Sequence, residues 1–450
     1  FLEMLTTARL DFPHARIVIK SHPETNAGYR PGHYRAEDAQ GNVSLYDGDA
    51  SPGALLDGAI AVYTLSSHMG FEAILAGHRP RLFGTPFYAG WGLTEDEAPI
   101  SRRTRRLTRA QLFAAAMILY PDWYDPYRDR PGSIETVLDA LDAQARAWRE
   151  DRTGWVASGM RLWKRGTIQS FYGGSRRVRF EDDPARARRI AESEGRGRMI
   201  WGGVAPADDQ AMRIEDGFLR SRGLGAALVP PLSLVGDPIG LYYDPRRPSL
   251  LEALISKRAA DLRPDQALRA RALIAKLTDA GLTKYNLVGT VPDLPDEPAL
   301  LVAGQVEDDA SILLGAPDGA TNAGLLARAR AAHPEATILY KPHPDVEAGL
   351  RKGQLTQGSA AEIVVTGGPV GALLDKVDAL WTWTSLIGFE ALLRGVPVTT
   401  LGAPFYAGWG LTRDLGPVPA RRLAGPRPPL EALVHAVLID YPRYRDPVTG

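Results

Sequence analysis

Short apolar runs alternate with amphipathic, helix-like stretches over much of the chain. Runs at 362–365, 379–384 and 396–402 are rich in Val, Ile, Thr and Trp, which favour strands. Strands that alternate with helices are typical of a parallel, doubly wound α/β sheet. In such sheets ligands bind outside the carboxyl ends of the strands, so we expect functional residues directly after the apolar runs.

One stretch of this pattern occurs twice. Residues 66–94 and 384–412 are identical at 17 of 29 positions when aligned without gaps. Each copy passes from a strand-like run through a Ser and a helix-like Gly-Phe-Glu-Ala to the loop PFYAGWGLT. A strand, a turn and a helix N-terminus favour a bound phosphate, because backbone N–H groups and the helix dipole attract it. Duplication of a packing unit explains the helix, but not why a loop keeps Phe, Tyr and Trp.

A second pair of segments shows how far the repeat extends. Residues 15–23 and 336–344 both end in Lys-x-His-Pro, and their Lys residues lie 321 positions apart. The offset is 318 in the first repeated stretch and 321 again near the end of each copy. We therefore predict that residues 1–130 and 296–450 are copies of one domain, and that the chain is a fragment of a longer protein.

The region between the copies has a different composition. We predict a linker at 131–180, where residues 152–180 contain seven Arg or Lys, interleaved with aromatic residues, and no acidic residue. Such a segment can lie on an anionic membrane surface or pack its aromatic rings on the neighbouring domain. The sequence leaves both interpretations open.

Residues 181–295 are predicted to form a second Rossmann-like lobe. Charged residues again follow the strand-like runs directly, and a Pro- and Asp-rich segment at 291–298 separates this lobe from the next. Two such lobes that face a cleft form the glycosyltransferase-B plan, which is an analogy at the level of the fold.

Composition narrows the classes of function. The formal net charge is +0 and there is no basic tail, which argues against nucleic acid as a partner. The absence of Cys excludes disulfides, thiolate metal sites and Cys nucleophiles, and permits a cytoplasmic address. No run approaches the roughly 18 apolar residues of a membrane span.

An acidic turn follows one strand-like run of the middle lobe. Glu215 and Asp216 precede a Gly, so their carboxylates should project into the cleft, where an acid or base is useful. Adjacent acids on a turn are more often helix caps or solvated surface. Arg220 and Ser221 strengthen the functional reading, because they can hold an anionic sugar or orient a carboxylate.

A denser acidic turn comprises Glu307, Asp308 and Asp309. Three adjacent carboxylates indicate either a divalent metal site or one nucleophile with solvated neighbours. The metal reading lacks a second group of ligands at a recognisable spacing, so we predict no metal.

An anion site is predicted where two further strands end. Lys341 and His343 lie on one strand face, and Thr384 and Ser385 stand at the following helix start. All four can contact a phosphate, although N-capping is the commoner use of Ser and Thr at such a position.

These residues belong to motifs that resemble a known family. The motifs are EDGFLRS, PPLSLV, YYD, KYNL, GQVEDDAS, KPHPD and GFEALL with PFYAGWGLT. They resemble those of the capsular polysaccharide β-Kdo transferases of the KpsC or LipA type, and the match covers nearly the whole chain. Kdo is an acidic octulosonate sugar.

The resemblance implies a fold and a reaction. It implies two Rossmann-like lobes of glycosyltransferase-B type, preceded by the C-terminal, donor-binding lobe of a second tandem module. It implies a retaining enzyme that transfers Kdo from CMP-Kdo to a phosphatidylglycerol-type glycolipid. The implied setting is the cytoplasmic face of the inner membrane, beside the capsule assembly and export machinery. No cofactor beyond the donor is expected.

The resemblance also implies roles for individual residues. Asp309 of the Gln305-x-x-x-Asp309 motif is expected to be the nucleophile, because retention requires two displacements. Glu215 or Asp216 is expected to act as acid/base. The expected CMP ligands are Lys341, His343, Thr384 and Ser385, and Glu390 is expected to contact the ribose or to play a capping role.

Two alternatives remain at this point. The protein can be an inverting transferase of the CMP-sialic-acid type that uses Glu215 or Asp216 as its only base. It can also be a non-catalytic protein of capsule export that binds polysaccharide. Positions equivalent to Asp309 and Glu215 in the first copy would fall before residue 1, so we predict that the first copy is inactive.

Overall fold

The computed structural model describes residues 1–48, 50–204, 210–223, 228–291, 293, 298–355 and 361–446. It divides into two compact units, Phe1–Leu141 and Asp142–Gly450. In the described part of the chain, no helix combines the length and the apolar character needed to cross a bilayer.

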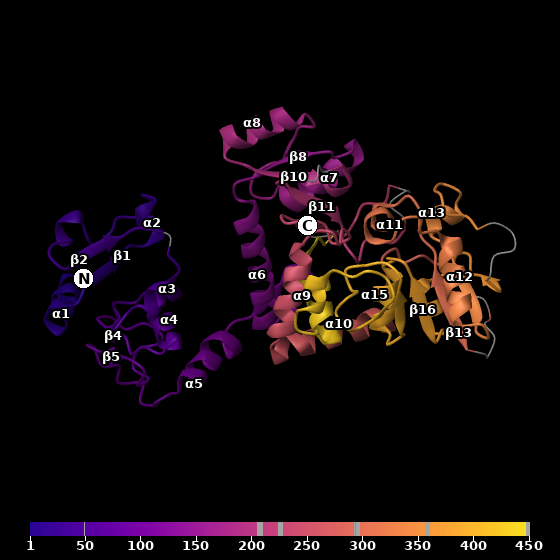
Figure 1. Cartoon of the computed structure of the whole chain (residues 1–450). Helices are drawn as coiled ribbons and strands as arrows, with labels where there is room; N and C mark the ends of the chain where they lie inside the picture. The colour runs from indigo at the N-terminus through magenta and orange to yellow at the C-terminus, as the bar shows by residue number, and fades with distance from the viewer. Residues whose placement is uncertain are drawn as a thin grey trace. The chain divides into compact units, whose positions relative to one another are not determined.

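The first unit contains two small parallel sheets and a hairpin (Figure 1). Its strands are β1 (Ile17–Lys20), β2 (Val43–Tyr46), β3 (Tyr63–Thr64), β4 (Arg81–Leu82), β5 (Glu95–Asp96), β6 (Trp123–Asp125) and β7 (Arg130–Gly132). Its helices are α1 (Leu2–Asp11), α2 (Pro23–Asn26), α3 (Pro52–Asp57), α4 (His68–Ala76) and α5 (Arg109–Phe113), followed by a π-helix (Ala114–Leu119). β1 pairs with β2, and β4 lies between β3 and β5.

The second unit contains two six-stranded sheets, which Figure 1 shows in separate lobes. The first-lobe sheet has the order β19 (Pro442–Tyr444), β12 (Ser233–Asp237), β11 (Met212–Asp216), β10 (Gly197–Trp201), β8 (Trp155–Ser158) and β9 (Arg179–Phe180). The second-lobe sheet has the order β15 (Ile363–Val364), β14 (Thr337–Lys341), β13 (Ala299–Ala303), β16 (Ala379–Thr382), β17 (Val398–Thr400) and β18 (Arg413–Asp414), and all its strands are parallel.

Helices accompany both sheets. Those of the first lobe are α6 (Ile134–Asp151), α7 (Leu162–Tyr172), α8 (Pro184–Glu194), α9 (Leu250–Ala260) and α10 (Pro264–Asp279). Those of the second lobe are α11 (Ala310–Gly315), α12 (Asn322–Ala332), α13 (Pro344–Glu347), α14 (Val370–Leu374), α15 (Ile387–Leu393), α16 (Ala420–Leu423) and α17 (Leu430–Val434), which continues into a π-helix (His435–Asp440). The predicted parallel α/β architecture is confirmed.

The central strand β13 explains how the second-lobe sheet is stabilised. All five of its side chains are buried, and they alternate between two apolar clusters. Leu301 packs in one cluster with α9, α14 and α15, whereas Leu300 and Val302 pack in the other with α12. Burial on both faces is what a doubly wound sheet requires, and it explains why the β13 sequence is apolar throughout rather than alternating.

The first unit lacks a counterpart of β13 among its described residues. With the offset of the sequence repeat, β1 and β2 correspond to β14 and β15, and β3 to β5 correspond to β16 to β18. In the second lobe β13 joins β14 to β16, whereas in the first unit β1 and β3 lie in two separate sheets. The described strands of the first unit thus lie in two sheets where their counterparts in the second lobe share one.

The predicted linker differs from the structure. Residues 131–180 include all of α6, β8, α7 and β9, and β8 pairs with β10 inside the first-lobe sheet. Tyr172 and Ile168 of α7 are buried in the core of this lobe. The first lobe therefore begins well before residue 181, because these aromatic and apolar side chains form its core. Of the two interpretations of this segment, packing of its aromatic rings on the protein fits the buried Tyr172, whereas a linker that faces a membrane does not.

The end of the chain returns to the first lobe. The strand β19 pairs antiparallel with β12, and the π-helix before it packs on α9. Asp440 accepts hydrogen bonds from Arg258 at 2.6 and 2.8 Å and also binds His435 at 2.9 Å. These contacts join α9 to the π-helix that precedes β19.

Candidate functional site

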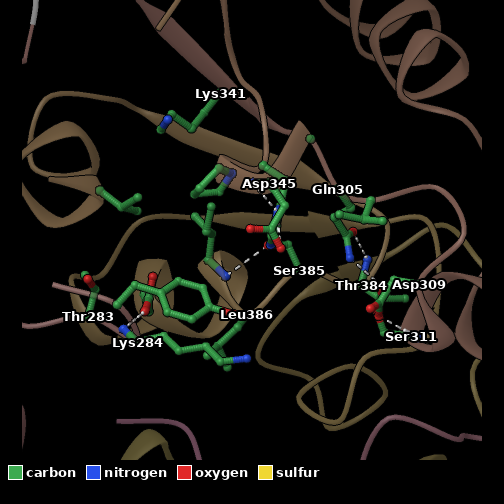
Figure 2. Close-up of a pocket in the computed structure, with 18 of the residues that line it drawn as sticks. Thr283, Lys284, Gln305, Asp309, Ser311, Lys341, Asp345, Thr384, Ser385 and Leu386 are labelled. Atoms are coloured by element: carbon green, nitrogen blue, oxygen red, sulfur yellow. Dashed lines mark hydrogen bonds and ion pairs between the residues drawn. The ribbon is translucent and has the colours of Figure 1, made fainter. Parts of the chain in front are cut away.

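A pocket of about 250 Å³ is lined by residues of both lobes of the second unit. The second lobe contributes the loops after β13, β14 and β16, and the side facing it includes Phe218, Tyr242, Tyr243 and Lys284. Figure 2 shows Thr283 and Lys284 on one side of this view and Asp309 and Ser311 on the other. The pocket lies at the carboxyl ends of the parallel strands, as expected for an α/β sheet.

Asp309 lines this pocket at the start of α11. Its Oδ2 accepts hydrogen bonds from the Ser311 N–H at 2.9 Å and the Ser311 hydroxyl at 2.7 Å. Helix capping explains the position of the carboxylate, since the N-cap residue satisfies a free N–H of the first turn. None of the other described residues hydrogen-bonds Oδ1, so one oxygen of a firmly oriented carboxylate is available to a ligand.

Gln305 connects the Asp309 loop to the turn after β16. Its amide donates to the Thr384 hydroxyl at 3.0 Å, and its carbonyl accepts from the Thr384 N–H at 2.9 Å. Both ends of this buried side chain are thus occupied by protein. The structure places Gln305 and Thr384 together, and it gives Gln305 a positioning role beside the pocket.

The Lys-x-His-Pro motif lies where β14 ends. Lys341 is buried, and its Nζ lies 3.3 Å from an oxygen of Glu347. His343 caps α13 by accepting the Asp345 N–H at its Nδ1, at 3.1 Å. Burial lowers the pKa of His343, although Asp345 opposes the shift, so the ring is mainly neutral at pH 7. A neutral ring with Nδ1 occupied can present an Nε2–H to a ligand.

Ser385 and the repeated loop form the third wall. The Ser385 hydroxyl accepts the Ile387 N–H at 3.3 Å, and its carbonyl accepts the Tyr406 hydroxyl. Phe405 lines the pocket, and the Trp409 N–H donates to the Phe405 carbonyl at 2.8 Å. The loop therefore keeps its aromatic residues because they build the turn that carries Ser385.

The first copy of this loop has the same local structure. The Tyr88 hydroxyl donates to the Ser67 carbonyl at 2.5 Å, and the Trp91 N–H donates to the Phe87 carbonyl at 2.8 Å. Gly90 and Gly408 both have positive φ, at 80° and 87°, which glycine adopts without strain. Packing thus explains the repetition of the loop, which the sequence left unexplained.

Glu390 lies on α15 at the edge of the pocket. It is buried, and its Oε1 accepts the backbone N–H of Lys284 at 2.8 Å. Burial raises the pKa of Glu390 to about 7. This hydrogen bond supports the Lys284 segment. A ribose contact of Glu390, as the resemblance implies, would therefore share a carboxylate that already accepts the Lys284 N–H.

The acidic turn at the end of β11 lies behind the pocket wall. Glu215 accepts a hydrogen bond from the Tyr243 hydroxyl at 3.0 Å, and Tyr243 lines the pocket, whereas neither Glu215 nor Asp216 does. Burial and the Asp216 charge raise the pKa of Glu215 to about 7. Tyr243 therefore connects the predicted acid/base to the pocket.

Arg220 and Ser221 hold this turn in place rather than facing the pocket. Arg220 is buried and pairs with Asp216 at 2.8 Å, and it also donates to the Ser221 hydroxyl at 2.8 Å. Ser221 in turn donates to the Gly223 carbonyl. Their side chains are engaged within the protein, so the structure gives them a supporting role where the sequence suggested sugar binding.

The described residues contain no group of three or more His, Asp or Glu side chains that could hold a metal ion. In the second acidic turn, Glu307 accepts the Asn322 N–H at 2.8 Å and Asp308 pairs with Arg351 at 2.8 Å. The three neighbouring carboxylates thus have three different partners.

Comparison with known proteins identifies the family. The model of the capsule polysaccharide biosynthesis protein family matches residues 1–121, 204–287 and 295–444. The chain belongs to this family. The capsule polysaccharide modification protein LipA of Neisseria meningitidis serogroup B is 39% identical over 467 residues, covering 99% of this chain and 66% of LipA. The lipopolysaccharide-processing protein LpsZ of Rhizobium meliloti is 47% identical over 239 residues, covering 52% of this chain and 54% of LpsZ.

Two solved structures of KpsC from Thermosulfurimonas dismutans are also similar. The structure described as a beta Kdo 2,7 transferase is 33% identical, covers 65% of this chain and 93% of that chain, and has a TM-score of 0.54. The one described as a beta Kdo 2,4 transferase is 31% identical, covers 66% of this chain and 93% of that chain, and has a TM-score of 0.55. The resemblance to capsule proteins of the KpsC and LipA type is confirmed. The chain spans 66% of the length of its LipA relatives.

In this capsule polysaccharide biosynthesis protein, sequence reasoning missed several residues that line the pocket. They are Tyr242, Tyr243, Lys284 and Asp345. Each lies inside or directly beside a quoted motif, namely YYD, KYNL or KPHPD. The motifs themselves were therefore the available signal, but their internal order does not show which side chain faces the ligand.

The equivalent residues of the first unit are arranged differently. His22 is 68% exposed, and Lys20 donates to the Gly48 carbonyl at 3.1 Å. Glu72, which matches Glu390, is exposed rather than buried. The first copy thus keeps the motif residues, and its predicted inactivity remains a prediction.

Proposed function

We propose that this capsule polysaccharide biosynthesis protein is a retaining glycosyltransferase that moves Kdo from CMP-Kdo to a lipid-linked Kdo acceptor. The observation that carries the proposal is the pocket itself, where Asp309 presents one free carboxylate oxygen near His343 and Ser385. The similarity to KpsC, described as a Kdo transferase and 33% identical, supports the choice of sugar.

In the proposed first step, Asp309 attacks the anomeric carbon of Kdo. The bond between this carbon and the phosphate oxygen breaks, and its electron pair leaves with CMP. The product is a covalent ester between Kdo and Asp309. Ser311 keeps Oδ2 occupied, which favours attack by Oδ1 and limits rotation of the carboxylate.

In the proposed second step, an acceptor hydroxyl attacks the same carbon from the opposite side. The bond to Asp309 breaks, and the carboxylate is regenerated with net retention. The hydroxyl proton passes to Tyr243, whose own proton moves to Glu215 across their 3.0 Å hydrogen bond. A carboxyl whose pKa lies near 7 suits this task at neutral pH.

The anionic sugar nucleotide needs hydrogen-bond donors and cations around it. His343 and the Ser385 turn are proposed to bind the CMP phosphate, since both lie where parallel strands end. The acceptor is proposed to be a phosphatidylglycerol-type glycolipid at the inner membrane surface, beside the capsule export machinery. That part of the proposal follows from the family resemblance.

Intact-mass spectrometry with CMP-Kdo tests the proposal. The unaltered protein should gain the mass of one Kdo residue, mapped to the peptide that contains residues 305–311, and Asp309→Ala should gain none. Asp318→Ala is the matched control, because Asp318 is exposed and does not line the pocket.

An Asp309→Ala variant that transfers Kdo at the normal rate would exclude the nucleophile role. A product of inverted configuration would instead favour the transferase of the CMP-sialic-acid type. Polysaccharide binding without any release of CMP would favour a non-catalytic role in export.

A further inference from the structure

Lys284 occupies a position in the pocket to which neither the sequence motifs nor the comparisons assign a role. Its backbone is fixed by residues from distant parts of the chain. The N–H donates to Glu390 at 2.8 Å, and the carbonyl accepts the N–H groups of Arg220 at 3.1 Å and Ser221 at 3.2 Å. None of these bonds involves the side chain.

The segment around Lys284 is shaped to keep this position. Asn286 has φ of 48°, and its side chain accepts the Thr283 N–H at 2.9 Å and donates to the Ser221 carbonyl at 3.0 Å. Asn is among the residues that adopt positive φ most readily. The Lys-Tyr-Asn sequence thus forms a tight loop that carries the ammonium group into the pocket wall.

The three cations that line the pocket differ in their partners. Lys341 lies 3.3 Å from Glu347, and Arg351 pairs with Asp308 at 2.8 Å. Within the described ranges no acidic oxygen lies at ion-pair distance from the Lys284 ammonium, which lies 5.2 Å from the ring centroid of Tyr285. Among the described residues, Lys284 is therefore the lining cation that has no carboxylate partner at ion-pair distance.

The electrostatic surroundings keep Lys284 charged. Burial opposes its charge, but Tyr285, Tyr242 and Asp216 outweigh burial and raise the pKa of Lys284 above its ordinary value. Its charge opposes the rise in the pKa of Glu215 and adds to the fall in the pKa of His343. Lys284 thus acts on the acidic turn and on the His-Pro motif at once.

We propose that the Lys284 ammonium is an anion-binding group that contacts an oxyanion of the sugar-nucleotide donor. This inference rests on the proposed function, because it takes the pocket to hold a nucleotide-activated acidic sugar. Such a donor carries two oxyanions, the phosphate and the sugar carboxylate, and a charge-assisted hydrogen bond from Lys284 suits either. Lys284 then neutralises charge on the side of the pocket away from Lys341 (Figure 2).

Three variants test the role of the side chain. Lys284→Met removes the charge and leaves the backbone bonds in place, and Lys284→Arg retains a charge. Lys276→Met is the matched control, since Lys276 is exposed on α10 and does not line the pocket. Calorimetric titration with CMP and steady-state release of CMP from CMP-Kdo are the two measurements.

Loss of one charge-assisted hydrogen bond corresponds to roughly a 10- to 100-fold weakening. If Lys284 contacts the phosphate, Lys284→Met should weaken CMP binding by this factor. If it contacts the sugar carboxylate, CMP binding stays normal while kcat/KM for the donor falls by this factor. In either case Lys284→Arg should recover part of the loss, and Lys276→Met should match the unaltered protein.

A Lys284→Met variant that matches an active, unaltered protein in both assays would overturn this inference and leave the proposed function intact. A weakening that Lys284→Arg does not relieve would also overturn it, because it would indicate shape rather than charge. An unaltered protein that neither binds CMP nor consumes the donor would contradict the proposed function, and this inference with it.

Discussion

Gly388 is the position where a single methyl group should most directly disturb the donor side of the pocket. A Cβ at Gly388 would lie 2.1 Å from the Tyr406 hydroxyl oxygen and 2.6 Å from the adjacent ring carbon. The Tyr406 side chain is fully buried, and its hydroxyl donates to the Ser385 carbonyl. Gly388→Ala must therefore displace the ring and break the bond that supports the Ser385 turn.

Opposing contributions set the expected magnitude. Overpacking costs about 1–3 kcal/mol, and leaving the buried Tyr406 hydroxyl without its acceptor costs about 1–3 kcal/mol. The Ser385 carbonyl keeps its other donor, the Gly388 N–H at 3.1 Å. Ala favours a helix over Gly by about 1 kcal/mol, which offsets part of this. We therefore expect a local destabilisation of about 3 kcal/mol and a loss of donor binding.

Hydrogen exchange measured by mass spectrometry suits a chain with two units, because a single unfolding free energy is not defined for it. Peptides covering 379–393 should exchange roughly 100-fold faster in Gly388→Ala. Gly70→Ala is the matched control, since its Cβ would lie 2.3 Å from the Tyr88 hydroxyl oxygen in the first unit. It should loosen residues 62–76 and leave transfer unchanged. Unchanged exchange in Gly388→Ala would refute the reasoning.

Three further predictions follow from buried charges. The pKa of Glu215 near 7 predicts that kcat/KM for the acceptor rises with pH through about 7 and that Glu215→Gln flattens this limb. A limb that persists in the variant would assign it to another group. The pKa of Glu215 is raised from 4.5 to about 7, so the contribution of this group to the stability of the folded state is complete below pH 4.5 and is lost as the pH rises to 7. The Tm should therefore be lower at pH 7 than at pH 4.5. Glu252→Ala should lower the unfolding free energy of the second unit by about 3–5 kcal/mol, because it leaves the buried Arg422 without its carboxylate partner. The control Arg271→Ala breaks the exposed pair with Glu431 and should cost about 0–1 kcal/mol. Equal falls in Tm for Glu252→Ala and Arg271→Ala would contradict this expectation.

The sequence by itself determined the local elements. The apolar runs at 379–384 and 396–402 contain β16 and β17, and the predicted strand ends before His343 and Ser385 match the ends of β14 and β16. These features depend on residues close together in the chain, so periodicity and turn chemistry report them. The repeat also showed that two distant segments share one local structure, which their matching Tyr hydroxyl bonds confirm.

Only the tertiary structure decided which residues face the ligand. Glu215 follows a strand as predicted, but Tyr243, 28 positions later, lies between its carboxylate and the pocket. Gln305 is bonded to Thr384, 79 positions away, and is thereby committed to positioning. The sequence predicted a linker where α7 buries Ile168 and Tyr172 in the first-lobe core, because local composition does not show which side chains of a basic, aromatic stretch are buried.

The physical reason is that a pattern along the chain specifies which residues are buried locally, but not what they are buried against. The Lys284 backbone is held by Arg220 and Glu390, which lie on either side of it in sequence and belong to different lobes. The energies of such long-range contacts depend on how the two lobes pack. The sequence therefore determined the family, the elements and the candidate residues, whereas the packing of the second unit decided which of them line the pocket and which support its walls.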